Sequence, residues 1–340
     1  MTTTLKTYIE QKKPIIEKNL KGFVDDLKGG KFVVPYSPSL IKNNRDFINC
    51  IKDILSGGKR IRPLMVYLVH ELVGGSFKKI DDLAIVPELA HKGSVVIDDI
   101  EDGAKLRDNK LALYQKYGIP AAINCGNFLY FAPILILNKV GMAKNHLQFL
   151  LKSYMEAGLV AHIGQGTDIY WRDKKVVPSE SEYLAMNAYK TSTFSFAMIV
   201  GALATGTDTK IIRILSKIGE SIGIAYQLKD DILSLDERAH DFGEDIRQGK
   251  ITLMLIRLIQ QRNVNAKVIK KFFSAKNSQR IKMVQEMVST IKNSGALIYT
   301  QKRANDIINE SKKKIIRYFP HSKIRDMLCK LADYAVEREI

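Results

Sequence analysis

Cysteine and proline are scarce in this chain. The three cysteines among its 340 residues, Cys50, Cys125 and Cys329, lie far apart and form no CxxC pair. This spacing excludes a disulfide framework and a zinc site built from cysteine pairs. Nine prolines, with 46% hydrophobic and 26% charged residues, also exclude a collagen-like or disordered chain. We therefore expect a globular protein of a reducing compartment and place it in the cytoplasm.

Long apolar segments are lacking as well. The first residues, MTTTLKTYIEQKKP, are polar and contain no apolar core of a signal peptide. No apolar run reaches the ~18 residues that a membrane span requires. The sequence therefore predicts a chain that does not cross a membrane.

Negative charge is the scarcer sign. The 53 Lys and Arg residues exceed the 36 Asp and Glu residues and give a formal net charge of +17. This excess favours nucleic acids, anionic membrane surfaces or small phosphates as ligands. Zinc-finger spacing, an RNP-like motif and a basic stripe interleaved with aromatic residues are missing. We therefore expect no nucleic-acid binding, and keep small phosphates and peripheral membrane contact as hypotheses.

Strand-like alternation is nearly absent, and most of the sequence carries apolar residues at three- and four-residue spacing. This pattern predicts an all-α fold. Breaks at Gly57-Gly58, at Gly74-Gly75 and around Arg172 to Pro178 separate the helices. Because no stretch resembles an interdomain linker or a repeat of constant period, we predict a single domain over residues 1–340.

Two largely apolar segments end in aspartates. LAHKGSVVIDDIED contains Asp98, Asp99 and Asp102 (the first aspartate cluster), and IGIAYQLKDDILS contains Asp230 and Asp231 (the second aspartate cluster). The outer acids of the first cluster lie four residues apart, on one face of a helix. Mg²⁺ relieves repulsion between such carboxylates and bridges them to phosphates. A solvated helix end would explain one cluster alone, whereas two facing clusters predict a metal-bound diphosphate at the mouth of a deep apolar cavity.

A clamp for an anion also needs cations. The basic loop, GGKRIRP from Gly57 to Pro63, supplies Lys59, Arg60 and Arg62 directly after two glycines. Glycines let backbone and cations approach a phosphate closely. Beside the two aspartate clusters, we interpret this loop as a diphosphate-binding element and not as a helix start with unrelated basic residues.

Together these motifs resemble the trans-isoprenyl diphosphate synthases, the polyprenyl synthetase family, from about Gly57 to Thr252. KLRDNK, GQGTD, YKTSTFS and GEDIRQGKIT extend the resemblance in the same order and at matching separations. The resemblance implies a helical bundle of the isoprenoid synthase type with a deep central cavity, assembled as a homodimer. It also implies condensation of isopentenyl diphosphate with an allylic prenyl diphosphate, assisted by about three Mg²⁺ ions per active site.

The resemblance assigns roles to individual residues. Isopentenyl diphosphate would be held by Lys59, Arg62 and His91, and Mg²⁺ would be bound by Asp98, Asp102 and Asp230. The allylic diphosphate would be contacted by Arg107, Lys190 and Lys250, and the path of the carbocation would be lined by Thr191 and Gln227. The catalytic set is completed by Asp99 and Asp231. The implied order is ionisation of the allylic diphosphate, attack by the alkene of isopentenyl diphosphate, and loss of a proton to the released diphosphate.

The resemblance also implies where product length is set. Gly93 and Ser94 lie about one helical turn, ~5.4 Å, before Asp98 on the same helix. Small side chains there leave room for a growing chain, so we expect a linear all-trans product of twenty carbons (geranylgeranyl diphosphate) or longer. A close helix contact at Gly93 is the alternative.

Some positions depart from the family pattern. Asp108 follows Arg107 where a second arginine is usual, and Asn109 stands in place of a glycine. Arg60 or Lys110 could compensate for the missing cation. In addition, Ser234 replaces the third acid of the second motif, and Ile97 stands where histidine is common.

Two other functions stay open. A class I terpene cyclase also ionises an allylic diphosphate, but Lys59, Arg62 and His91 argue for a second diphosphate site. A non-catalytic regulatory subunit of a hetero-oligomeric synthase would tolerate Asp108 and Ser234, although it would not need both aspartate clusters.

Overall fold

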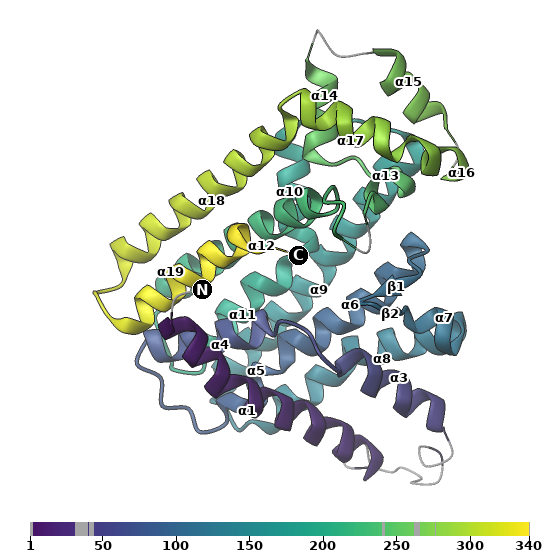
Figure 1. Ribbon diagram of the computed structural model, residues 1–340. Coiled ribbons are helices and arrows are strands. Elements are labelled where there is room, and N and C mark those ends of the chain that lie inside the picture. The colour runs from purple at the N-terminus through teal and green to yellow at the C-terminus, as the bar shows by residue number, and fades with distance from the viewer. Residues whose placement is uncertain are drawn as a thin grey trace. The chain divides into compact units, whose positions relative to one another are not determined.

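The structure is a computed structural model that describes residues 3–30, 40, 44–239, 242–261, 266–275 and 277–339. Most of these residues are helical (Figure 1), which confirms the predicted all-α class. The chain divides into two compact units. Unit 1 comprises residues 1–158, 196–216 and 322–328, and unit 2 comprises residues 159–195, 217–321 and 329–340. The single domain expected from the sequence stays a prediction.

Unit 1 contains most of the N-terminal half of the chain. Its complete elements are α1 (Thr3–Lys28), α3 (Arg45–Leu55), α4 (Ile61–Leu72), α5 (Ile80–Ala84), α6 (Val86–Asp102), β1 (Leu106–Arg107), β2 (Lys110–Leu111), α7 (Leu113–Tyr117) and α8 (Ile119–Lys139).

Unit 2 contains most of the C-terminal half. Its complete elements are α10 (Glu180–Lys190), α13 (Glu244–Gln248), α14 (Leu253–Gln260), α15 (Ala266–Ser274), α16 (Asn277–Arg280), the 3₁₀ helix η1 (Ile281–Met283), α17 (Val284–Asn293) and α18 (Ala296–Tyr318). Four helices contribute residues to both units: α9 (Lys144–Lys174), α11 (Ser192–Leu203), α12 (Thr209–Leu233) and α19 (Lys323–Glu337).

Helices α6 and α8 pack closely within unit 1 (Figure 1). Two glycines permit this approach, because a Cβ added to Gly93 on α6 would lie 2.9 Å from the carbonyl oxygen of Gly126 on α8. A Cβ at Gly126 would in turn lie 2.9 Å from Cδ1 of Ile97. Side chains larger than hydrogen at either glycine would therefore separate the two helices.

The strands β1 and β2 form a two-residue hairpin directly after α6. Leu106 pairs with Leu111 and Arg107 with Lys110, so Asp108 and Asn109 make the turn. Both turn residues have positive φ, 49° and 62°. Asp and Asn tolerate this conformation better than most residues, and two-residue hairpin turns require it.

Two helices of unit 2 begin with side-chain caps. Ser179 and Glu182 form a reciprocal capping box at the start of α10, and the side chain of Thr252 caps α14. A Cβ added to Gly223 would lie 2.4 Å from Oγ1 of Thr191, so glycine allows α12 to touch the residue that follows α10. This contact places Thr191 beside the face of α12.

Helix α8 bears on the expectation that the chain does not cross a membrane. At 21 residues it is long and apolar enough to cross a membrane by length and composition alone. A search for uninterrupted apolar runs overlooks it because Asn124 and Asn127 divide the run without greatly lowering its mean hydropathy. Core helices pass the same test, but only 33% of the most apolar part of α8 is buried. Its exposed side chains include Ile119, Ile123 and Phe131.

Candidate active site

The basic loop in unit 1 is built around a buried arginine. Gly57 and Gly58 have φ of 74° and 105°, and Arg60 also has positive φ, 55°, before α4 begins. The Arg60 guanidinium donates to Glu17 of α1 at 2.8 and 3.1 Å and to Glu88 of α6 at 2.9 Å. Burial alone would lower the pKa of Arg60, but the bonds to both carboxylates outweigh it and raise the pKa. The loop is thus held by α1 and α6 on either side of its central residue.

Lys59 and Arg62 flank this anchored residue. Lys59 is exposed and Arg62 is half-buried. Because Arg60 fixes the backbone between them, both side chains start from a defined position. The loop therefore has the fixed backbone and the two flanking cations that a phosphate site needs.

The first aspartate cluster contains one buried and two accessible acids. Asp98 and Asp102 are half-buried, with 31% of the Asp98 side chain exposed, whereas Asp99 is only 2% exposed. Arg107 Nε donates to Asp99 Oδ1 at 2.9 Å, and its Nη2 lies 3.8 Å from Asp98 Oδ2. Burial outweighs Arg107 and raises the pKa of Asp99 to about 6. The accessible acids can serve as ligands while Asp99 anchors the hairpin.

His91 lies among cations. Burial and then the charges of Arg62, Lys92 and Arg107 hold the pKa of His91 well below its ordinary value. The adjacent Lys92 is 7% exposed, and burial lowers its pKa too. A neutral imidazole surrounded by positive charge fits a pocket that accepts an anion.

The two predicted chain-length residues differ in their surroundings. Gly93 lies against α8, as its contact with Gly126 requires. Ser94 is half-buried, and its hydroxyl donates to the carbonyl oxygen of His91 at 2.8 Å. The helix contact weighed as an alternative for Gly93 is thus present, and a role in product length stays a prediction for both residues.

The second aspartate cluster, in unit 2, repeats the pattern of the first. Asp231 is 4% exposed; it accepts hydrogen bonds from the hydroxyl of Tyr183 and from Nε2 of Gln227, the latter at 3.1 Å. Burial, helped by nearby Asp245, raises the pKa of Asp231 to about 7. The side chain of Asp230 is 43% exposed. In both clusters the first acid is accessible and the second is buried and hydrogen-bonded.

Ser234 does not supply a third ligand in the described geometry. It is buried, and its hydroxyl donates to the carbonyl oxygen of Asp231 at 2.8 Å. The residue thus caps the end of α12 locally. Its replacement of an acid leaves Asp230 as the accessible carboxylate of the second cluster.

Arg338, near the C-terminal end of the described chain, contacts the second cluster. Its Nη2 lies 2.6 Å from Asp230 Oδ1 and donates to the carbonyl oxygen of Tyr226 at 2.7 Å. The guanidinium also stacks 3.6 Å from the centre of the Tyr226 ring. Arg338 therefore orients Asp230 and offsets its charge.

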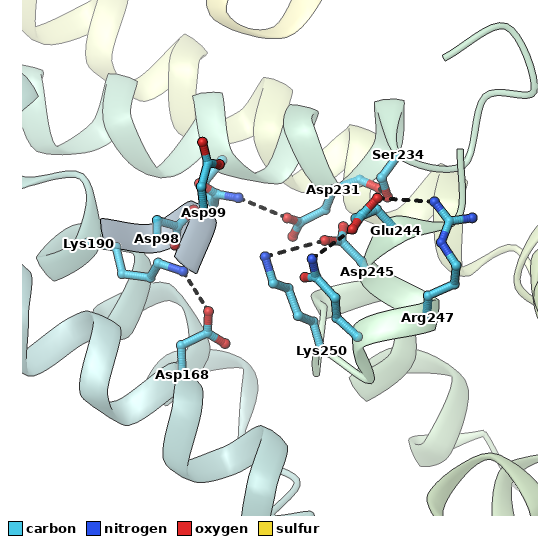
Figure 2. Close-up of polar contacts among 12 residues, drawn as sticks. Asp98, Asp99, Asp168, Lys190, Asp231, Ser234, Glu244, Asp245, Arg247 and Lys250 are labelled. Atoms are coloured by element: carbon cyan, nitrogen blue, oxygen red, sulfur yellow. Dashed lines mark hydrogen bonds and ion pairs between the residues drawn. The ribbon is translucent and has the colours of Figure 1, made fainter. Parts of the chain in front are cut away.

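Two of the predicted phosphate-binding lysines are paired with acids of unit 2, as Figure 2 shows. Lys190 Nζ donates to Asp168 Oδ2 at 2.5 Å, and Lys250 Nζ lies 3.7 Å from Asp245 Oδ1. The pairs orient the ammonium groups. Thr191, the neighbour of Lys190, donates its hydroxyl to the carbonyl oxygen of Asn187 at 2.7 Å.

The donor set fits a hard cation that is bound jointly with phosphate. Among the described residues, no three His, Cys, Asp or Glu side chains form a metal site by themselves. The accessible donors of the clusters, Asp98, Asp102 and Asp230, offer carboxylate oxygens only. Mg²⁺ suits such a set, because it uses one or two carboxylates and completes its shell with phosphate oxygens and water.

The structure thus brings together Lys59, Arg62, His91 and the first cluster within unit 1. Lys190, Thr191, Gln227, Lys250 and the second cluster belong to unit 2. The placement of Asp98 opposite Asp230 stays a prediction.

A pocket of about 420 Å³ in unit 1 is lined by residues of the α4–α5 loop, including Phe77 and Lys79, and contains none of the predicted site residues.

Several supporting residues escaped the sequence reasoning. Asp168 lies in GQGTD without an assigned role, and Glu88 directly precedes the segment that leads to the first cluster. An acid inside an apolar run was an available signal for Glu88. Glu17 and Arg338 carry no such signal, because their partners are far away in the sequence.

Known proteins with similar sequences and folds identify the family of this chain. The polyprenyl synthetase family matches residues 44–291. A geranylgeranyl diphosphate synthase of Methanosarcina mazei is 31% identical over 291 residues, which cover 84% of this chain and 87% of that relative. A geranylgeranyl pyrophosphate synthase of Eremothecium gossypii is 32% identical over 288 residues, covering 81% and 88%. The crystal structure of geranylgeranyl pyrophosphate synthetase from Pyrococcus horikoshii matches with a TM-score of 0.84 at 28% identity and covers 98% of both chains. On this match and these likenesses, the chain belongs to the polyprenyl synthetase family.

Proposed function

We propose that this chain is a prenyltransferase that condenses isopentenyl diphosphate with an allylic prenyl diphosphate. The product is a linear all-trans prenyl diphosphate of twenty carbons or more. The observation that carries the proposal is the repeated build of the two clusters: Asp98 and Asp230 are accessible, while Asp99 and Asp231 are buried and hydrogen-bonded. The names of the relatives, geranylgeranyl diphosphate synthases, support the same substrate class.

The cations divide into two sets. In unit 1, Lys59, Arg62 and the donor N–H of neutral His91 would bind the diphosphate of isopentenyl diphosphate. In unit 2, Lys190 and Lys250 would neutralise the allylic diphosphate, each oriented by its own carboxylate. Arg107 would bridge from its pair with Asp99 to the same leaving group.

Asp98, Asp102 and Asp230 would hold Mg²⁺. The chemistry that bound Mg²⁺ supplies is Lewis-acid stabilisation of charge on the leaving diphosphate. The hydroxyl oxygen of Thr191 and the carbonyl oxygen of Gln227 would stabilise positive charge on the allylic carbon. Gln227 is positioned for this because its amide nitrogen already donates to Asp231, which fixes the orientation of the side-chain amide.

Assembly and location are part of the proposal. The exposed apolar side chains of α8, among them Ile119 at 49%, Ile123 at 40% and Phe131 at 67%, suit an interface with a second copy of the chain. We propose a cytoplasmic homodimer. Its net charge of +17 would favour transient contact with anionic membranes, which binding to anionic vesicles at low salt would test.

The decisive experiment uses the purified full-length chain with Mg²⁺, labelled isopentenyl diphosphate and each of the C5, C10, C15 and C20 allylic diphosphates. Chromatography of the products is expected to show label in a chain of twenty carbons or more. Asp98→Asn and Asp230→Asn should each reduce the rate at least a hundredfold, because each removes a charge from the leaving-group site.

Two outcomes would contradict the proposal. Cyclised product without incorporation of label would identify a terpene cyclase. Absence of product with every allylic partner, restored by a second family member that is inactive alone, would identify a regulatory subunit. The acid at position 108, Asp108, is the observation that favours testing for a regulatory subunit.

A further inference from the structure

Asp108 removes a cation beside the predicted site for isopentenyl diphosphate. The polyprenyl synthetase pattern has a second arginine after the position of Arg107, and here an acid stands there. The hairpin gives a local reason, since Asp108 and Asn109 both have the positive φ of a two-residue turn. Unit 1 thus needs another cation if the diphosphate is to be bound with full charge compensation.

Neither basic residue that the sequence offers as a replacement is suitable. Arg60 is 1% exposed, and its guanidinium is bonded to Glu17, Glu88 and the carbonyl oxygen of Leu55. Lys110 lies exposed on β2, and its charge acts on the carboxylate of Asp53 on α3. Arg60 therefore supports the loop from behind and does not face a ligand.

Lys92 supplies a cation at the right place. It directly follows His91 on α6 and is 7% exposed. Its Nζ would lie 3.4 Å from a Cβ added to Gly58, so the ammonium group lies against the glycines of the basic loop. Arg107 and Asp108 of the hairpin are among the charges that act on it. Lys92 is thus close to the basic loop, to His91 and to the hairpin.

The charge around Lys92 favours an incoming anion. Burial, Arg60 and Arg107 lower the pKa of Lys92, whereas Glu88 and Asp108 act in the opposite direction. Glu88 already accepts a hydrogen bond from Arg60. A buried ammonium group among other cations is costly, and a diphosphate beside it would replace that cost with charge-assisted hydrogen bonds.

We propose that Lys92 binds the diphosphate of isopentenyl diphosphate together with Lys59, Arg62 and His91, and that it replaces the arginine lost at Asp108. The inference rests on the proposed function and identifies one more substrate-binding residue for it. The cation has moved from the hairpin turn to α6, and the anion at position 108 lies within electrostatic range of it.

Steady-state kinetics of Lys92→Gln, Lys92→Arg and the matched surface variant Lys110→Gln test the inference. Lys92→Gln should raise KM for isopentenyl diphosphate about tenfold to a hundredfold, while kcat and KM for the allylic diphosphate change less than about twofold. Lys92→Arg and Lys110→Gln should stay within about threefold of the parent chain. In the Lys92→Gln background, Asp108→Arg should restore most of the lost affinity.

A binding measurement separates this inference from the proposed function. Calorimetric titration with inorganic pyrophosphate, without metal, should show about tenfold weaker binding for Lys92→Gln even if no product forms with any allylic partner. A folded Lys92→Gln variant with unchanged KM and unchanged pyrophosphate affinity would overturn the inference and leave the proposed function intact.

A second variant keeps the test informative if Lys92→Gln does not fold. Asp108→Arg in the otherwise unchanged chain should lower KM for isopentenyl diphosphate by less than about threefold, because Lys92 already supplies the cation. A decrease of about tenfold or more would show that the cation was missing, and would contradict the role of Lys92.

Discussion

Each aspartate cluster contains one acid that the fold removes from water. The pKa values of Asp99 and Asp231, about 6 and about 7, lie above the ordinary value of 3.8. Burial is the largest cause in both cases, so the folded chain binds protons more tightly than the unfolded chain. These acids are therefore held at some cost in stability at neutral pH, as residues of functional sites often are.

The sign of the resulting pH dependence is fixed by the raised pKa values. Between about pH 4 and pH 7 the folded state carries more protons at Asp231, so its contribution to the free energy of unfolding falls as the pH rises. Denaturant unfolding in EDTA should show that Asp231→Asn removes this slope, by less than about 1.4 kcal/mol per pH unit. The variant Asp306→Asn, at an exposed acid on α18, is the control. An identical slope in the parent chain and Asp231→Asn would contradict the assignment.

Product length offers a second test at the scale of single residues. Ser94→Phe should shorten the product, because the aromatic ring would occupy space one turn before Asp98. Gly93→Phe should instead reduce the melting temperature, because even its Cβ would lie 2.9 Å from the carbonyl oxygen of Gly126. Chromatography and thermal unfolding distinguish the two effects. A Ser94→Phe variant with an unchanged product would show that the chain does not pass this residue.

The sequence predicted the charged residues of the site better than their supports. The exposure of Asp98 and the burial of Asp99 are compatible with the spacing on one helix, since neighbouring residues point to different faces. The burial of Arg60 could not be foreseen, because its partner Glu17 lies 43 residues earlier. Local pattern contains no information about such a pairing.

At the scale of elements, helix α1 supports the basic loop although it lies outside the part of the chain that the family matches, residues 44–291. Its Glu17 accepts two hydrogen bonds from Arg60. The helix therefore acts as a brace for α4 and its preceding glycines. No local pattern in the sequence predicted this role.

Removal of the brace should weaken both the fold and the site. Glu17→Gln should lower the free energy of unfolding by about 1–3 kcal/mol, because Arg60 loses a charged acceptor while it stays buried. It should also raise KM for isopentenyl diphosphate, since Lys59 and Arg62 start from the same loop. Glu10→Gln, an exposed acid on the same helix, is the matched control. Equal urea unfolding midpoints for the two variants would refute the bracing role.

At the scale of the whole molecule, the apolar surface of α8 governs assembly. Phe131→Glu should convert the proposed dimer into a monomer, because it places a charge in the centre of an apolar interface. Sedimentation velocity measures the change, and Ile298→Glu on α18, another highly exposed apolar residue, should leave the dimer intact. A parent chain that sediments as a monomer at micromolar concentration would contradict the proposal.

The sequence predicted the all-α class of the molecule, because helical spacing runs through nearly the whole chain. It did not predict the two-unit division or the α8 surface. Both depend on which helical faces meet, and faces such as those of Gly93 and Gly126 are selected by contacts between segments distant in the sequence. The metal-bridged arrangement of the two clusters stays the central prediction.

The glycine contact between α6 and α8 brings the two helices close and restricts sliding or rotation of one on the other. Asp98 follows Gly93 by little more than one turn on α6, so its position is fixed by α8. If α8 is also the surface that joins two copies of the chain, mild denaturation should abolish turnover at the same denaturant concentration that separates the subunits. The proposed metal-binding carboxylates and the quaternary structure would then unfold as one cooperative unit.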